Sequence, residues 1–140
     1  NAEIAEDAYY NYAKLNYEMA SPFKDPIQTF KDYLAKYPES RHRKKINEYL
    51  ANLYITSKDY DRAMDAIKIA GLNSPEMRGV FQKIAFYRAI ELFNSGALKG
   101  ALDRFEQSAQ YPEDKALATL SLYWQGINLQ TNVENREYQK

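Results

Sequence analysis

The chain contains no cysteine and only one histidine, His42, among its 140 residues. The lack of cysteine excludes disulfides, thiolate metal sites and a cysteine nucleophile, and a single histidine excludes a paired-histidine zinc site and a conventional histidine triad. The sequence also lacks a phosphate-binding glycine loop and a Gly-x-Ser-x-Gly nucleophile elbow. We therefore expect a protein that is not an enzyme, with no catalytic residues, no metal and no cofactor.

The chain also lacks an excess of charge of either sign, because nineteen basic side chains balance nineteen acidic ones. A chain with no net charge creates no global field that favours nucleic acid or an anionic membrane. The longest uncharged stretch, residues 116–133, is long enough to raise the question of a membrane span. Its amides would all need polar partners in lipid, so we expect a buried helix and no direct membrane span.

Turn-forming residues are scarce, with five glycines and five prolines, whereas hydrophobic residues make up 45%. Few turn formers in a chain of this length imply few connections, which favours long helices over many short strands. Three of the prolines, Pro38, Pro75 and Pro112, lie 37 residues apart, and each is followed by glutamate. Proline suits the first turn of a helix and glutamate meets the positive end of its dipole, so each Pro-Glu pair is predicted to start a helix.

When the chain is aligned with itself at this interval, several further positions carry residues of one type in successive periods. Each such set of aligned positions is called a column here, and their recurrence indicates a repeat protein. Each period divides into two segments of helical spacing. In the second period Asp59 is placed to cap the second helix and Gly71 to stop it. In the first period Ser21-Pro22 falls in the break, and Asp25 and Pro26 are placed to begin the second helix. One of these columns is aromatic (Tyr12, Tyr49, Tyr87, Trp124). In another (Lys14, Ala51, Ala89, Gly126), the small residues Ala51, Ala89 and Gly126 are predicted to allow close helix packing, whereas Lys14 stands where a small residue is expected.

This pattern resembles the tetratricopeptide repeat (TPR) family. The residues that carry the resemblance are Ala63, Ile67 and Pro75 in the second repeat, Ala101 and Phe105 in the third, and Trp124 and Gly126 in the fourth. It implies an all-α, right-handed superhelical solenoid of antiparallel helix pairs, with about three and a half repeats and seven to eight helices. The repeats would cover approximately residues 3–38, 39–74, 75–111 and, incompletely, 112–140, in one array that is a fragment of a longer protein.

Two phrases, residues 36–40 and 123–126, resemble the bacterial envelope subclass of TPR proteins, which includes those of the Tol-Pal system and of outer-membrane barrel assembly. The resemblance implies a periplasmic or outer-membrane-associated protein, with the cytoplasm as the alternative. Residues 113–131 are expected to form the first helix of the fourth pair, and its partner helix would start near Glu134. That first helix is apolar most of the way round, so we expect missing repeats, a partner or a second copy to cover its free face.

The resemblance also implies function, because the first helices of such arrays line a concave groove that binds a segment of a partner protein. Helical phase predicts that Phe86, Phe93 and Tyr123 form an apolar patch there, unless further repeats cover them. The full set of predicted groove residues is Asn11, Leu15, Glu48, Asn52, Phe86, Ile90, Phe93, Tyr123 and Ile127, with Glu18, Lys45, Ile55, Lys83 and Gln130 on the same face.

Two other functions remain open. The repeats could be a structural or oligomerisation module of a larger protein, with the 113–131 helix as the contact between copies. They could also bind nucleic acid through the aromatic column and the basic run at residues 41–45. We favour packing between repeats for the aromatic column and a solvated helix start for the basic run, so we expect a protein or peptide partner and no nucleic acid.

Overall fold

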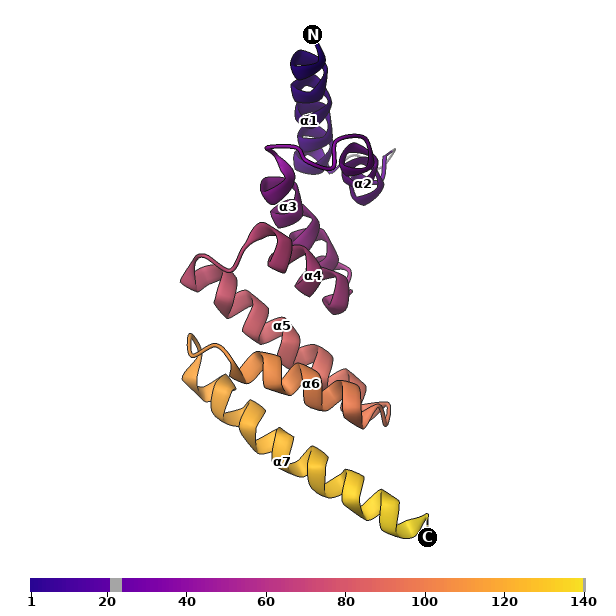
Figure 1. Cartoon of the computed structure of the whole chain (residues 1–140), viewed down its shortest axis with the longest axis vertical. Coiled ribbons are helices and arrows are strands. Elements are labelled where there is room, and N and C mark those ends of the chain that lie inside the picture. Colours follow the sequence, from indigo (N-terminus) through magenta and orange to yellow (C-terminus); the bar gives the residue numbers. More distant parts are fainter. Residues whose placement is uncertain (21–23, 140) are drawn as a thin grey trace.

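The computed structural model describes residues 1–20 and 24–139, and all regular structure in these residues is α-helical (Figure 1). Seven helices follow one another, and the described residues contain no strand, which confirms the all-α prediction. The two termini lie at opposite ends of the long axis of the molecule. The helices are α1 (Ala2–Met19), α2 (Pro26–Lys36), α3 (Arg43–Thr56), α4 (Tyr60–Ala70), α5 (Pro75–Asn94), α6 (Leu98–Ala109) and α7 (Lys115–Tyr138).

Most of the predicted helix ends are confirmed. The Asp25 carboxylate accepts a hydrogen bond from the Ile27 amide at 2.9 Å, and Pro26 is the first residue of α2. Asp59 caps α4 through the Arg62 amide, and α4 stops at Gly71, whose φ of 106° is a left-handed conformation that favours glycine. The break expected at Ser21-Pro22 lies outside the described residues.

Two of the three Pro-Glu pairs do not start a helix. Pro75 is the first residue of α5, but α3 begins at Arg43 and α7 at Lys115, several residues after their Pro-Glu pairs. The residue before the proline explains the difference. Ser74 supplies a hydroxyl that accepts from the Met77 amide at 3.1 Å, whereas tyrosine precedes the other two prolines and cannot cap. For α7 the cap comes later, from Asp114.

The fourth pair also differs from the prediction, because α7 continues through Glu134 to Tyr138 as one helix of 24 residues. Residues 127–138 contain neither glycine nor proline, so nothing in the sequence interrupts the helix there. Gly126 is exposed, and a Cβ built on it would meet no atom of the described residues within 4 Å. The close packing predicted for this column therefore occurs at Ala51 and Ala89, which are buried, but not at Gly126.

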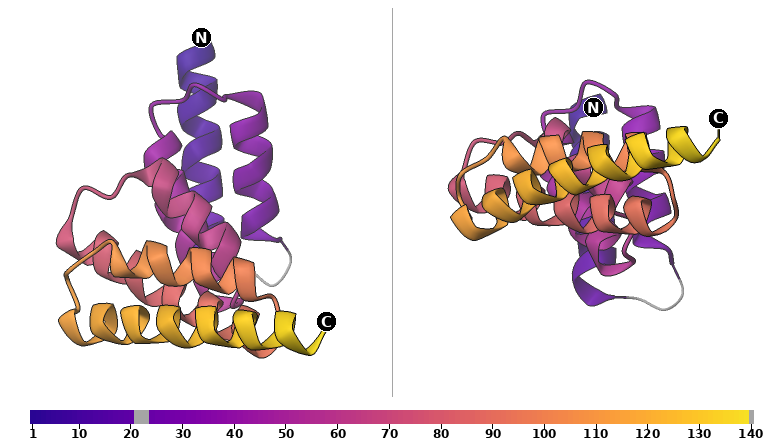
Figure 2. Two further views of the ribbon diagram at one scale, coloured as in Figure 1. Left: turned by 60° about the horizontal axis from the view of Figure 1, so that its bottom comes forward. Right: turned by 90° about the horizontal axis from the view of Figure 1, so that it is seen from below.

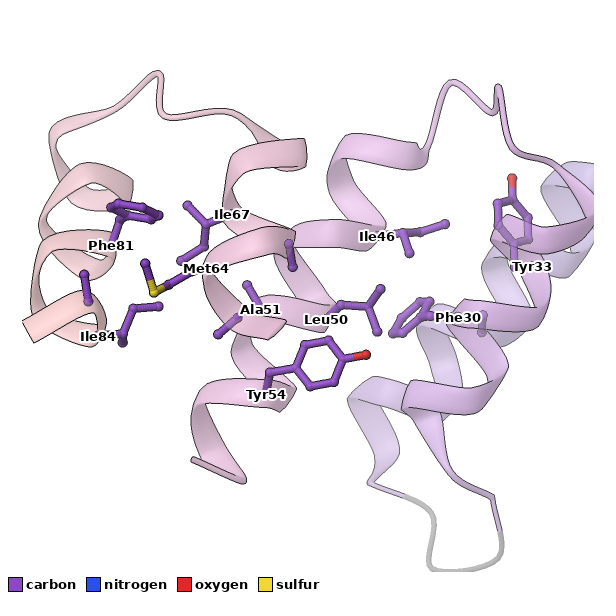
Figure 3. Close-up of a cluster of buried hydrophobic side chains, with 14 residues drawn as sticks. Phe30, Tyr33, Ile46, Leu50, Ala51, Tyr54, Met64, Ile67, Phe81 and Ile84 are labelled. Atoms are coloured by element: carbon purple, nitrogen blue, oxygen red, sulfur yellow. The ribbon is translucent and has the colours of Figure 1, made fainter. Parts of the chain in front are cut away.

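The core consists of two adjacent clusters. The larger one runs through α1 to α5 and contains the fully buried Phe30, Tyr33, Ile46 and Ile67 (Figure 3). The smaller one joins α5 to α6 through Ala89, Ala101 and Phe105, with Trp124 of α7 packed against it. Successive helices thus pack on one another, most extensively α3 on α4 and α5 on α6.

A buried polar network holds the start of α7 against α5 and α6. Gln82 is fully buried; its Nε2 donates to the Asp114 carbonyl at 2.9 Å, and its Oε1 accepts from the Asp114 amide at 3.0 Å. The hydroxyl of Ser108 donates to the Gln82 carbonyl at 2.7 Å and lies 3.0 Å from the hydroxyl of Ser121. The side chains of Gln82, Ser108 and Ser121 are therefore paired with one another and with the backbone.

At the N-terminal end, residues of the turn between α2 and α3 form ion pairs, a hydrogen bond and a ring stack with α1. The His42 ring stacks on Tyr10 with centroids 3.8 Å apart, and its Nε2 lies 3.0 Å from the Asp7 carboxylate. Arg41 reaches the same carboxylate at 2.6 Å and Glu3 at 3.1 Å. Arg41 and His42, which begin the basic run at 41–45, therefore both contact α1.

This cluster predicts that the fold loses stability in acid. Hydrogen bonds from His42 and Arg41 hold the pKa of Asp7 below its ordinary value. Since the pKa is lower in the folded chain, the stabilisation is present above the unfolded value, about 3.9, and is lost as pH falls through the folded one. We expect Asp7→Asn to lose less stability than wild type in urea titrations between about pH 5 and about pH 3. Glu106→Gln, on the exposed surface of α6, is the control, and parallel profiles for Asp7→Asn and wild type would contradict the assignment.

Candidate protein-binding surface

A surface pocket of about 370 Å³ lies where α3, the start of α4 and α5 meet. The α5 residues stand three to four positions apart, which places them on one stripe of the helix. Asn52 and Ile55 face them from α3 with the same spacing. The lining residues are Asn52, Ile55, Tyr60, Val80, Lys83, Ile84 and Tyr87.

The pocket is apolar inside and polar at its rim. Ile84 is buried, while Val80 and Tyr87 keep 39% and 41% of their surface exposed. The rings of Tyr60 and Tyr87 lie 5.9 Å apart, and the Lys83 ammonium lies 5.9 Å above the Tyr87 ring. Apolar walls with a few polar groups are typical of a binding pocket, so this site can receive an apolar side chain while Lys83 meets a carboxylate or carbonyl beside it.

The predicted groove residues of α1 and α3 lie on the surface, and Asn52 is the one that lines this pocket. Asn11 and Leu15 are exposed on α1, away from the pocket. Glu48 is half-buried on α3 and pairs with Lys45 at 3.5 Å. Ile55 and Lys83, which the helical phase placed on the same face, also line the pocket. Of the residues predicted for the groove face, the structure thus brings together Asn52, Ile55 and Lys83.

The aromatic patch expected at the C-terminal end of the groove is not formed by Phe86 and Phe93. Phe86 packs on Phe105 with centroids 5.7 Å apart, and Phe93 packs on Trp124 at 5.3 Å. Ile90 belongs to the same packed cluster. The reason is that α6 and α7 both lie against α5, with Phe105 of α6 on Phe86 and Trp124 of α7 on Phe93. Ile127 is half-buried and Tyr123 is exposed on α7.

Four pocket residues were not among the predicted ones: Tyr60, Val80, Ile84 and Tyr87. Val80, Ile84 and Tyr87 lie on the same stripe of α5 as Lys83, so extending that stripe in both directions would have found them. Tyr60 opens α4, and its position depends on the angle between α3 and α4, which helical phase alone does not contain.

The aromatic column divides into half-buried and exposed members. Tyr49 packs between Tyr17 and Phe30, and Trp124 stacks on Phe105 with the rings 7° from parallel. Tyr12 and Tyr87 keep large exposed surfaces. The column therefore mixes packing residues with surface residues and does not present four successive free rings.

On another surface a charged cluster ties three helices together. The Asp61 carboxylate of α4 lies 3.0 Å from Arg88 of α5 and 3.2 Å from Arg104 of α6. Each arginine also pairs with an acid on its own helix, Glu91 and Asp103 respectively. Both arginines are thus paired within the cluster, which joins α4 to α5 and α6.

Further chemistry of the described residues is limited. Among residues 1–20 and 24–139, no three histidine, aspartate or glutamate side chains come close enough together to hold a metal ion. None of the helices in this part of the chain combines the length and apolar character that crossing a membrane requires. Comparisons with protein-family models, with curated proteins and with solved structures find no match for this chain.

Proposed function

We propose that this chain is a non-catalytic scaffold that binds a segment of a partner protein, with the pocket between α3 and α5 as its main anchoring point. The observation that carries the proposal is the pocket itself, an apolar, partly aromatic hollow with Asn52 and Lys83 at its rim. Extended or helical segments that bind such surfaces insert one or two side chains as anchors. An apolar anchor residue beside a carboxylate would match both parts of this site.

The repeat pattern supports a particular architecture for the scaffold. Long helices α1, α3 and α5, of 18, 14 and 20 residues, alternate with short helices α2, α4 and α6, of 11, 11 and 12 residues. We propose that these pairs are TPR-like repeats of a right-handed solenoid whose first helices line the binding face. From the sequence resemblance alone, we place the protein in the bacterial periplasm or at the outer membrane, with the cytoplasm as the alternative.

The proposal predicts that a carboxylate introduced into the pocket abolishes peptide binding. Peptides would be selected from a displayed random library against the wild-type chain, and their affinities measured for wild type and Val80→Glu. Because the new charge would be placed against an apolar ligand side chain, we expect the dissociation constant to rise at least about tenfold. A consensus with an apolar or aromatic anchor is expected among the selected peptides.

Ile69→Glu is a matched control, since Ile69 is β-branched, lies on α4 outside the pocket and is 37% exposed, close to the 39% of Val80. Circular dichroism would establish that both variants keep the helical content of wild type. Equal affinities for Val80→Glu and wild type would contradict the proposal. Binding that falls steeply with added salt and tolerates Val80→Glu would favour the nucleic-acid alternative instead.

A further inference from the structure

The free face of α7 carries a regular apolar stripe. Figure 2 shows α7 as the outermost helix at the C-terminal end of the molecule, with α6 on one side of it. On α7, Leu122, Leu129 and Val133 are exposed to 61%, 51% and 55%, and the exposed Gly126 lies between the two leucines. Their successive spacings of four, three and four residues are those of the contact seam between two packed helices.

The structure shows how the equivalent faces of other helices are used. Ala51 of α3 and Ala89 of α5 occupy the column of Gly126, and both are buried in helix pairs, α3 with α4 and α5 with α6. Leu92, one turn beyond Ala89, lies over Gly100 of α6, where a Cβ built on the glycine would come within 3.4 Å of the leucine side chain. The stripe on α7 is thus built like faces that elsewhere in this chain bind a helix.

The lack of charged residues along the stripe indicates what kind of partner fits it. No charged residue occurs between 116 and 133, and the stripe is flanked by the neutral amides Gln125, Gln130 and Asn132. An acidic or basic partner would find nothing to pair with on this face. Two copies of the same face can meet without any like-charge contact along the stripe, and each would cover the apolar surface of the other.

We propose that two copies of this chain associate through α7, with the helices antiparallel about a twofold axis. In this arrangement Leu122 of one copy faces Val133 of the other, and Leu129 faces Gly126. Every large side chain thus meets a smaller or β-branched one. The missing side chain at Gly126 leaves room for Leu129 and lets the two helices approach closely. This interface is separate from the α3–α5 pocket, so each proposal can fail without the other.

The first test is the mass of the chain in solution as a function of concentration, by sedimentation. We expect a monomer–dimer equilibrium in wild type and at least an about tenfold weaker dimer in Leu129→Glu. The control is Ile4→Glu, an apolar residue exposed to 67% at the opposite end of the molecule. Helical content and Trp124 emission would verify that the variants remain folded. A wild-type chain that stays monomeric at every concentration, or an unchanged dimer in Leu129→Glu, would overturn the proposal.

The second test fixes the orientation and uses the absence of cysteine in the chain. Leu122→Cys and Val133→Cys would be prepared separately and oxidised alone and mixed. In the antiparallel arrangement position 122 of one copy is offset from position 122 of the other by eleven residues, about 16 Å along the helix. Each variant alone therefore stays unlinked, and the mixture forms a disulfide dimer. Efficient linking of either variant with itself would contradict this arrangement.

Discussion

Replacing Phe105 with alanine is expected to lower the free energy of unfolding by about 3–5 kcal/mol. Phe105 is fully buried at the centre of the smaller core cluster, where it contacts both neighbouring long helices. Its ring stacks on Trp124 of α7 with centroids 6.1 Å apart and meets Phe86 of α5 edge-on at 5.7 Å. The alanine variant would leave a cavity at the point where α5, α6 and α7 meet.

Urea unfolding followed by circular dichroism gives this free energy, and the emission of Trp124, the only tryptophan, reports on the α6–α7 contact. We expect the emission of the variant to shift to longer wavelength at lower urea than in wild type. Tyr123→Ala is the control, because Tyr123 neighbours Trp124 but is 62% exposed. A loss in Phe105→Ala no larger than in Tyr123→Ala would show that α7 is not held by this cluster.

Replacing Gln82 with leucine is expected to cost about 1–3 kcal/mol, although the new side chain is apolar and of similar size. The amide of Gln82 pairs with both backbone groups of Asp114, the residue that caps α7. Leucine can satisfy neither group, so the cost comes from lost hydrogen bonds and not from a cavity. The damage should be local, at the first turn of α7.

Urea unfolding measures the total cost, and hydrogen exchange at the Leu117 amide, which donates to Asp114 at 2.9 Å, locates it. We expect faster exchange at that amide in Gln82→Leu than in wild type. Gln110→Leu, on an exposed position after α6, is the matched control. Wild-type stability together with wild-type exchange in Gln82→Leu would show that this network does not fasten α7.

Local sequence signals predicted helix ends where the capping atom is next to the helix. Asp25, Asp59 and Gly71 each bond to a residue two to four positions away in the chain, so the sequence alone contains the necessary geometry. The Pro-Glu signal failed at Pro38 and Pro112 because proline permits a helix start but does not satisfy the free amides there. At Pro75 the Ser74 hydroxyl accepts from one of these amides. A correct prediction therefore requires both the proline and a capping residue before it.

The candidate site could be predicted only as far as helical phase extends. Helical phase identified Asn52 and Ile55 on α3 and Lys83 on α5, because the face on which a residue lies depends only on its position within its own helix. The packing of Phe86 and Phe93 depends on where α6 and α7 lie relative to α5. The position of Tyr60 depends on the turn between α3 and α4. These are angles between helices, and the repeat pattern of the sequence does not determine them.

The central claim, that the α3–α5 pocket is the binding site, is tested most directly by amide chemical shifts of the isotope-labelled chain during titration with a selected peptide. The claim predicts that the largest shift changes occur at Asn52, Ile55, Val80, Lys83 and Tyr87, and that Val80→Glu removes them while Ile69→Glu does not. Changes that concentrate on α1 or on the α7 stripe, with the pocket amides unmoved, would contradict it.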